Sequence, residues 1–434
     1  MPSNCFIISQ KFDLHPVVKT NKNIRINYYH VLKFFVDQCS ENDVYIEAKM
    51  EQYRKLFVGN AEYTIHSTNI DGIVKSIVNN TFKPWRRKLR YFLLCDLAFV
   101  LASKSMVQDA LRLMKKYLRK KQRAIMDEFF ENVFDNSRCS TRVKSADILL
   151  NQIHANQAFM MRPEKRIIVT ANMSAGKSTL INAIVGKPVA RTAQEACTST
   201  LCYVYNKAFE DNAVHFLASP INLNATYDEL YEMSKNKNIC IASYFRTISE
   251  SSYRICMIDT PGVNSALHKE HGELTRNILS NYTYDKVVYV FNANRLGTDE
   301  ELDYLKYISE RIPKNKIVFV INKLDNYRNI DDSIEASIDG VRNDLARLGY
   351  KNPVICPISA YFAFLVKMKQ CGEQLSEDEQ DVFDLYAKKF HKPEYDLSRY
   401  YETTPENMSS NEDFLNNLCN RCGLYGLETI LFGS

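Results

Sequence analysis

The sequence predicts an α/β domain with a mostly parallel sheet, preceded by an all-α helical region. Up to about residue 155, apolar residues recur at the three- and four-residue spacing of amphipathic helices. After that point, short β-branched runs alternate with helical patterns, which is typical of a parallel sheet covered by helices on both faces. A length of 434 residues suits two such parts, so we expect a boundary between residues 1–155 and 156–434.

The helical region is basic, whereas the remainder of the chain is mildly acidic. Residues 1–155 contain 25 Lys and Arg against 15 Asp and Glu, and residues 156–434 contain 31 against 36. An apolar stripe from Met106 to Val133 predicts one long amphipathic helix with a basic outer face. The plainest interpretation is a bundle, or part of a stalk, with solvated lysines. An anionic membrane surface is the partner that this charge favours.

The composition also bounds the class of protein. Twelve cysteines are scattered along the chain, which suits a reducing compartment better than a disulfide scaffold. No apolar run reaches the roughly 20 residues that a membrane-spanning helix needs. The first residues lack the basic-then-apolar order of a secretory signal. We therefore expect a cytoplasmic protein that is at most peripheral to a membrane.

Six short apolar runs after residue 160 are expected to be strands. In chain order they are 166–170, 202–205, 253–258, 286–291, 316–321 and 353–358. The amphipathic stretches 298–311 and 330–348 are expected to be the helices that connect some of them. A closing helix is expected over 411–431, and the polar residues 373–412 are interpreted as a surface insertion rather than a site.

The first chemical motif follows the first expected strand directly. A turn, ANMSAGKST, precedes the helical run LINAIVG, and a strand, a Gly-Lys-Ser turn and a helix form the context of a phosphate-binding loop. Backbone amides and the helix dipole face the phosphates there. Lys177 is expected to reach the β- and γ-phosphates, and the Ser178 hydroxyl to hold Mg²⁺. The residues assigned to the nucleotide cradle are Asn172, Ala175, Gly176, Lys177, Ser178 and Thr179.

The loop departs from the usual pattern at one position. Ala171 stands where a first glycine is common. If that position required a positive φ, alanine would cost about 1 kcal/mol. The motif alone therefore does not decide the function.

Two further motifs supply candidates for the metal ion and the γ-phosphate. In IDTPGV, Asp259 comes at the end of an expected strand, where a carboxylate suits the Mg²⁺ shell. The Gly262 amide is expected to contact the γ-phosphate and to change shape on hydrolysis. The segment RTAQEACTSTL lies between these motifs, and we choose Thr198 over Thr200 as its ligand for Mg²⁺ and the γ-phosphate.

The remaining motifs point to guanine. In NKLD, the Asp325 carboxylate can accept two hydrogen bonds from guanine N1 and N2, which selects guanine over adenine. Asn322 is expected to support the loop, and the stem of Lys323 to cover the base. Ser359 and Ala360 follow the last expected strand, where the Ala360 amide can meet guanine O6. Five motifs in this order, each after an expected strand, predict a P-loop GTPase domain that binds GTP, GDP and Mg²⁺.

The motifs also resemble those of one superfamily. The run NMSAGKSTLINAIVGKPV, followed by EACTST, IDTPGV and INKLD, is similar to the dynamin superfamily, particularly bacterial dynamin-like proteins. The resemblance covers about 160–360 and extends toward 434 through CGLYGLETIL. It implies GTP hydrolysis coupled to dimerisation of GTPase domains across their nucleotides, or to self-assembly, with membrane remodelling as the associated process.

The resemblance also implies catalytic roles. Ser174 matches the serine that helps to place K⁺ or Na⁺ against the transition-state charge, and Lys177 and Thr198 complete the expected catalytic set. Val263 stands where other GTPases carry a water-positioning glutamine. Met173 stands where dynamins often have glutamine, which together with Ala171 leaves open a slow enzyme or a GTP-switched interaction module.

Two further expectations concern the partners and the extent of the chain. A GTPase acting on RNA or ribosomes is the alternative function, ranked lower because residues 1–155 carry no RNA-recognition signature, so a nucleic-acid partner is not expected. Dynamins normally carry stalk helices after the GTPase domain. The end of this chain at Ser434 therefore favours a truncated protein.

Overall fold

A computed structural model describes most of the chain. The described residues are 4–41, 43–59, 70–79, 84–135, 143–172, 174–190, 201–217, 221–233, 239–247, 251–261, 275–280, 283–328, 333–402 and 414–433. They divide into a helical unit, Met1–Met161 with Lys207–Ala225, and a sheet unit, Arg162–Asn206 with Thr226–Ser434. The domain boundary expected after residue 155 stays a prediction.

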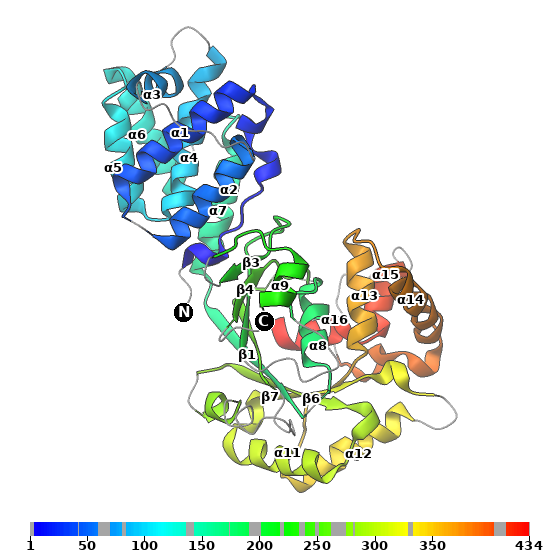
Figure 1. Cartoon of the computed structure of the whole chain (residues 1–434). Coiled ribbons are helices and arrows are strands. Elements are labelled where there is room, and N and C mark those ends of the chain that lie inside the picture. The colour runs from blue at the N-terminus through cyan, green and yellow to red at the C-terminus, as the bar shows by residue number, and fades with distance from the viewer. Residues whose placement is uncertain are drawn as a thin grey trace. The chain divides into compact units, whose positions relative to one another are not determined.

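The helical unit is a bundle built around one apolar helix. Its α-helices are α1 (Lys22–Cys39), α2 (Val44–Phe57), α3 (Ile70–Val78), α4 (Leu89–Leu101), α5 (Lys104–Lys115), α6 (Lys120–Phe134) and α7 (Asp147–Met161). Short 3-10 helices at Asn4–Ile7, Phe12–Leu14, Pro16–Lys19 and Pro84–Lys88, and strand β3 (His215–Leu217), also belong to this unit. Helix α4 is buried almost all round, as expected of a helix that is apolar on every face (Figure 1).

A buried carboxylate fastens this bundle together. Asp96 on α4 is fully buried, and its oxygens accept hydrogen bonds from the hydroxyls of Tyr28 at 2.5 Å and Tyr53 at 2.8 Å. His15 Nε2 lies 3.0 Å from the same carboxylate. A buried carboxylate needs such partners because its desolvation is costly. The cluster therefore ties the N-terminal segment, α1 and α2 to the central helix.

The long helix predicted from Met106 to Val133 is wrong in one respect, because the stripe belongs to two helices. The chain leaves helical geometry between α5 and α6, where Arg119 is extended and its N–H donates to the Gln122 side chain at 2.9 Å. Lys115 then pairs with Asp127, which shows that α6 folds back along α5. The apolar periodicity continues across the break because both helices pack their apolar faces against the same core.

The sheet unit carries a mostly parallel sheet, which confirms the predicted fold class. Its strand order is β4-β2-β5-β1-β6-β7-β8, and the β2–β5 pair is antiparallel whereas the other pairs are parallel. The strands are β1 (Glu164–Ala171), β2 (Cys202–Asn206), β4 (Ile239–Ser243), β5 (Arg254–Asp259), β6 (Lys286–Asn292), β7 (Ile317–Asn322) and β8 (Ile355–Pro357). The sequence predicted neither β4 nor the short strand β3 of the helical unit.

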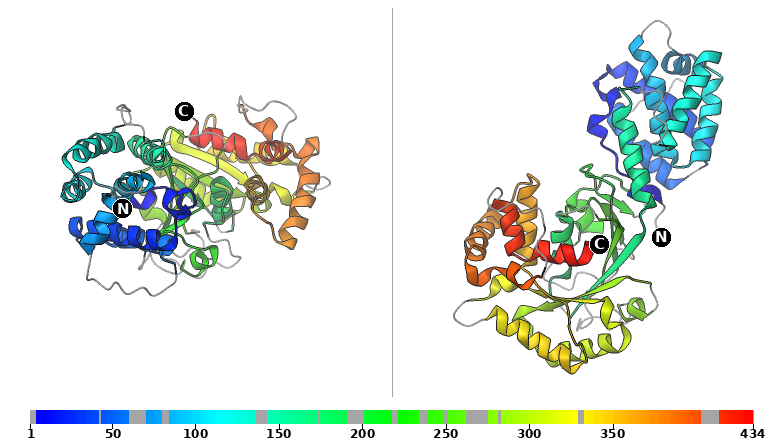
Figure 2. Two further views of the ribbon diagram at one scale, coloured as in Figure 1. Left: turned by 90° about the horizontal axis from the view of Figure 1, so that it is seen from above. Right: turned by 180° about the vertical axis from the view of Figure 1, so that it is seen from behind.

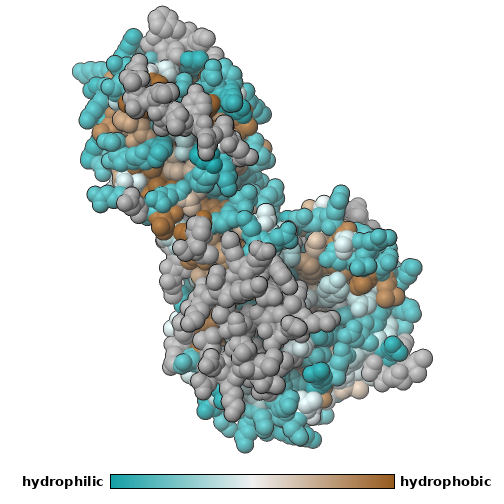
Figure 3. Space-filling view, in the orientation of Figure 1, coloured by the Kyte–Doolittle hydropathy of each residue, from teal (hydrophilic) through white to brown (hydrophobic). Residues whose placement is uncertain are grey.

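Helices cover both faces of this sheet or pack beside it. They are α8 (Lys177–Val185), α9 (Tyr227–Met233), α11 (Asp299–Arg311), α12 (Ile334–Arg347), α13 (Ala360–Gln370), α14 (Glu377–Phe390), α15 (Phe414–Arg421) and α16 (Leu424–Phe432). Helices α11 and α12 lie on one face, and α8 and α16 on the other (Figure 1). The outer surface of α11 and α12 is hydrophilic (Figure 3), as amphipathic helices on a sheet require. Helices α13, α14 and α15 pack together beside the sheet (Figure 2).

The single closing helix predicted over 411–431 is two helices in the structure. Gly423 lies in the short connection between α15 and α16. Its φ of +87° is in the left-handed region that favours glycine. A side chain there would also collide with the backbone carbonyl of Pro357. The break therefore lets the chain pass close to the end of β8.

Candidate nucleotide-binding site

The predicted motifs gather at one edge of the sheet, where parallel strands end. Ala171 ends β1, Asp259 ends β5 and Asn322 ends β7, and Ser359 follows β8 by two residues. Val169 pairs with Asp259 across the β1–β5 ladder, which places the metal candidate beside the phosphate loop. Ligands of open α/β sheets bind at this edge because the loops from neighbouring strands diverge there.

The backbone of the phosphate loop adopts positive φ angles after Ala171 and not at Ala171 itself. Ala171 is a buried strand residue without a positive φ, so alanine carries no strain at this position. The left-handed residues are Ser174, with a φ of +56°, and Gly176, with a φ of +87°. Ser174 is exposed, and its carbonyl accepts a hydrogen bond from Asn292 Nδ2 at 3.2 Å. Asn292, at the end of β6, was not predicted as a site residue.

Asn322 joins three of the motifs. Its Nδ2 donates to the carbonyl of Ala175 at 2.9 Å, and its Oδ1 accepts from the amide of Ala360 at 2.9 Å. The side chain is 2% exposed, so both hydrogen bonds are shielded from water. The phosphate loop, the NKLD loop and the start of α13 are therefore held in one fixed arrangement.

The Asn322 side chain lies so close to Gly176 that only a residue without a Cβ fits there. A Cβ at Gly176 would lie 2.5 Å from Asn322 Nδ2 and would add left-handed strain of about 1–2 kcal/mol. We expect Gly176→Ala to lower the free energy of unfolding by more than that strain and to weaken GDP binding. Chemical denaturation and titration calorimetry measure the two effects.

Gly297→Ala is the matched control for this substitution. Gly297 has a φ of +73°, and no atom lies within 4 Å of the position its Cβ would take. The control therefore carries the strain without the collision. Equal losses of stability and equal GDP affinity in the two variants would contradict the role given to the Gly176–Asn322 contact.

Lys177, Ser178 and Asp259 form the charged centre of the site. Lys177 is 8% exposed, and burial lowers the pKa of its ammonium while the nearby Asp259 opposes that shift. Burial likewise raises the pKa of the Asp259 carboxyl, against the effects of Lys177 and of the Ser178 hydrogen bond. Ser178 Oγ donates to Asp259 Oδ2 at 2.7 Å. Each charge thus has an opposite charge nearby in a desolvated setting.

The donor set fits a hard divalent cation. Asp259 Oδ1 is buried and has no hydrogen-bond partner in the part of the chain that the structure describes. A hydroxyl and a carboxylate are oxygen ligands of the kind that Mg²⁺ takes together with phosphate oxygens and water. No cluster of three or more His, Cys, Asp or Glu able to hold a metal occurs among the described residues. The Ser178 hydroxyl and the Asp259 carboxylate suit an ion whose other ligands are phosphate oxygens and water.

The opposite end of the site presents the Asp325 carboxylate. Asp325 is 8% exposed, and its Oδ1 accepts a hydrogen bond from Ser359 Oγ at 2.6 Å. Lys323 beside it has a φ of +71°, and burial lowers the pKa of its ammonium. The backbone conformation turns the loop so that Lys323 and Asp325 both stand at the carboxyl edge of the sheet. This arrangement can bind the hydrogen-bonding edge of a planar base.

One contributor to this loop comes from the segment interpreted as a surface insertion. Lys389 Nζ on α14 donates to the carbonyl of Asp325 at 2.6 Å and also to the carbonyl of Tyr327. The contact joins residues 64 positions apart in the chain. No motif or spacing marks such a pair, so the sequence alone offered no signal for it.

Several predicted residues lie outside the part of the chain that the structure describes. They are Met173, Thr198, Gly262 and Val263. The other predicted nucleotide ligands, Asn172 and Thr179, lie in the phosphate loop and in the first turn of α8. The roles predicted for all of these residues stay predictions.

A comparison with protein families finds a match that includes most of the motifs described above. Residues 167–324 match the family model described as the dynamin family. This segment is of the dynamin family. The match confirms the resemblance predicted from the sequence, and it spans the phosphate loop, the Asp259 strand and the start of the NKLD motif.

Proteins of a plant and of a bacterium are similar to parts of this chain. The chain is 26% identical over 220 residues to a probable transmembrane GTPase FZO-like, chloroplastic, of Arabidopsis thaliana, covering 50% of this chain and 21% of that protein. It is 26% identical over 167 residues to dynamin-like protein A of Bacillus subtilis, covering 38% and 14%. The chain thus spans a minor part of either relative.

A solved structure of an oligomerised bacterial dynamin pair, described as sensing and tethering membranes at long range, is also similar. It shares 16% identity with the chain at a TM-score of 0.38, covering 88% of this chain and 72% of that one.

Among the described helices of the present chain, none combines the length and the apolar character that crossing a membrane requires.

Proposed function

We propose that the chain binds GTP and hydrolyses it to GDP and phosphate. The observation that carries the proposal is the Asn322 bridge, which holds the phosphate loop, the NKLD loop and the Ser359–Ala360 turn together at one sheet edge. A guanine nucleotide has its phosphates and its base at the two ends of such a site. The match to the dynamin family and a relative named as a GTPase support the same activity.

The phosphate end would bind and neutralise the triphosphate. Lys177 at the start of α8 would contact the β- and γ-phosphates, aided by backbone amides of Asn172 to Thr179 and by the helix dipole. Ser178 and Asp259 would hold Mg²⁺ together with Thr198, and the ion when bound neutralises charge that develops on the phosphate oxygens. Gly262 would contact the γ-phosphate. These residues bind and orient the reacting group.

The base end would select guanine. The Asp325 carboxylate would accept hydrogen bonds from guanine N1 and N2, held in position by the Ser359 hydroxyl. The stem of Lys323 would cover the ring, and the Ala360 amide, which already bonds to Asn322, lies at the turn expected to face O6. Adenine offers no matching pair of donors, so it would leave buried polar groups unpaired.

Hydrolysis would be completed by self-association of GTPase domains. Ser174 is exposed and held in a left-handed conformation on the rim of the phosphate loop, where a K⁺ or Na⁺ ion could be placed against the transition-state charge. The dynamin-family match supports activation by a second copy of the domain. Thr198 would join Lys177 and Ser174 in the catalytic set. Such preorganised charges account for much of phosphoryl-transfer catalysis.

We further propose a cytoplasmic protein whose basic residues 1–155 form a separate domain facing an anionic membrane surface. Their excess of positive charge supports this partner, and a relative named as a transmembrane GTPase supports a connection with membranes. Residues 156–434 would then be the GTPase domain. Membrane remodelling is the process that this combination suggests.

GTP turnover should rise faster than linearly with protein concentration if the active form is a dimer. Phosphate release from GTP, measured across a wide range of protein concentration in K⁺ buffer, is expected to give a specific activity that increases and then saturates. Replacing K⁺ and Na⁺ by a bulky organic cation is expected to lower that plateau. Added anionic vesicles would test the membrane proposal in the same assay.

A constant specific activity over the whole concentration range would contradict the dimer, and absence of turnover at every concentration would contradict hydrolysis. ATP in place of GTP is the control for contaminating phosphatases. Neutral vesicles are the control for anionic ones, because only the anionic surface attracts a basic region.

A further inference from the structure

Helix α14 is fastened to the base end of the site by a cluster of aromatic rings. The ring of Phe362, two residues after Ala360, lies 5.9 Å from that of Phe383, 5.9 Å from that of Tyr386 and 5.1 Å from that of Phe390. These three α14 residues recur at spacings of three and four, which place them on one face of the helix. The start of α13 and the inner face of α14 are therefore packed against each other.

The polar end of the same helix face contacts the NKLD loop itself. Lys389 Nζ donates to the carbonyls of Asp325, at 2.6 Å, and Tyr327. The ammonium also lies 4.5 Å from the centre of the Tyr395 ring, whose hydroxyl donates to the Tyr327 carbonyl at 3.4 Å. Two carbonyls that flank one turn of the loop are thus bound by a single charged group. Hydrogen bonds to charged groups are stronger than those between neutral groups.

The Tyr386 hydroxyl interacts with the side chain of Asp325. Burial, and then the charge and the side-chain hydrogen bond of Asp325, raise the pKa of Tyr386 to about 12. The phenol is therefore protonated at neutral pH and faces the carboxylate as a neutral hydroxyl group. A carboxylate has about four acceptor positions. Ser359 occupies one of these positions, so acceptor positions remain for guanine N1–H and N2–H.

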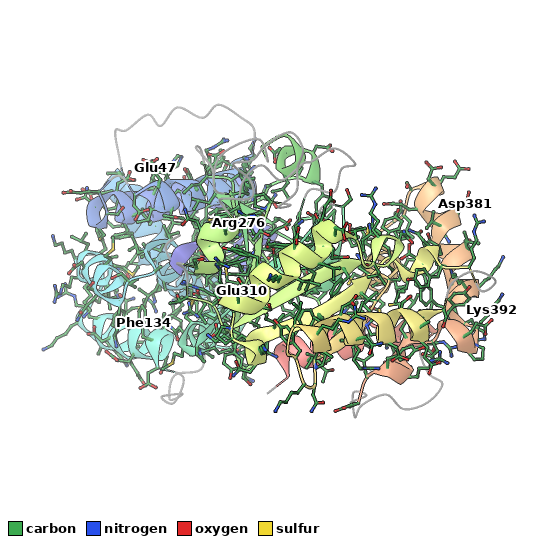
Figure 4. All side chains as sticks on the ribbon, turned by 90° about the horizontal axis from the view of Figure 1, so that it is seen from below. Glu47, Phe134, Arg276, Glu310, Asp381 and Lys392 are labelled. Atoms are coloured by element: carbon green, nitrogen blue, oxygen red, sulfur yellow. The ribbon has the colours of Figure 1, made fainter. Side chains whose placement is uncertain are left out.

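We propose that Lys389 and Tyr386 are positioning residues for guanine recognition, Lys389 through the backbone of the NKLD loop and Tyr386 through the carboxylate of Asp325. The proposal rests on the proposed function, because it assigns to α14 a part of the same base site. Asp381 in α14 and Lys392, two residues after the end of that helix, are labelled in Figure 4 and are exposed. The inner face alone carries the recognition role.

Two variants and one matched control test this role. Lys389→Met removes the ammonium and keeps a long side chain, and Tyr386→Phe removes the hydroxyl and keeps the ring against Phe362. Lys388→Met removes the same charge from the neighbouring, exposed position. Each protein is titrated calorimetrically with GDP, with inosine diphosphate, which lacks the 2-amino group, and with ADP. Thermal unfolding of each protein shows whether it is folded.

The wild type is expected to bind GDP more tightly than inosine diphosphate and much more tightly than ADP. Lys389→Met and Tyr386→Phe are each expected to weaken GDP binding by about tenfold, the effect of losing a hydrogen bond with a charged group. They should weaken inosine diphosphate binding less, because that ligand makes one hydrogen bond fewer to Asp325. The ratio of the two affinities therefore falls in both variants and is unchanged in Lys388→Met.

A purely structural role would lower the melting temperature and leave the ratio of GDP to inosine diphosphate affinity at the wild-type value. If the wild type prefers GDP to ADP but the ratio of GDP to inosine diphosphate affinity is unchanged in the folded variants, the proposal is overturned. If the wild type shows no preference for GDP over ADP, the proposed function itself fails. Should one variant not fold, the ratio measured in the other decides.

Discussion

Lys177→Ala is expected to abolish detectable GTP turnover, with kcat/KM reduced by about a thousandfold or more. Lys177 starts α8 and is the cation closest in the chain to the phosphate-loop amides. Its ammonium is buried, so its attraction to phosphate oxygens is weakly screened by water. Alanine would also leave the buried Asp259 carboxylate without its positive neighbour and facing the phosphates. Repulsion then adds to the lost attraction.

Phosphate release under multiple turnover and GDP titration by calorimetry measure the two parts of this effect. Lys306→Ala removes a lysine from the exposed face of α11 in the same unit and serves as the control. Circular dichroism shows whether the variant is folded. Turnover of Lys177→Ala within tenfold of the wild type would contradict the placement of the phosphates at the start of α8.

The sequence could predict those parts of the site that follow directly from a strand. Lys177, Asp259 and Asn322 each lie within a short motif at a strand end, so local pattern and the geometry of parallel sheets suffice to bring them together. The antiparallel pairing of β2 with β5 and the existence of β4 could not be predicted in this way. They depend on partners distant in the chain, and periodicity within one segment does not contain that information.

The same limit explains the contributions that were missed. Asn292 and Lys389 reach the site through contacts with Ser174 and Asp325, over 118 and 64 positions of sequence. The surrounding sequence of Lys389 is polar and charged, which is equally typical of a solvated helix. The ring packing on Phe362 and the hydrogen bonds of Lys389 hold α14 against the base loop. A long-range contact of this kind has no local signature.

Asp325→Asn is expected to reverse the base preference of the protein. The side chain is 8% exposed, and one of its oxygens is already engaged by Ser359. Asparagine replaces an acceptor by an NH₂ group, which would face the N2 amino group of guanine with two donors opposed. Each buried group left unpaired costs about 1–3 kcal/mol, so GDP affinity should fall by about a thousandfold.

The Asp325→Asn variant should bind xanthosine diphosphate more tightly than the wild type does. The carbonyl at C2 of xanthine replaces the amino group of guanine and can accept a hydrogen bond from the new asparagine NH₂, while N1–H still donates to the remaining oxygen. Calorimetric titration with GDP and xanthosine diphosphate is therefore expected to show the wild type preferring GDP and the variant preferring xanthosine diphosphate. Asp303→Asn, the same change at an exposed position of α11, should leave the preference unaltered. Loss of both ligands with the fold intact would mean that Asp325 holds the loop rather than the base, because a direct contact must transfer affinity to the complementary ligand.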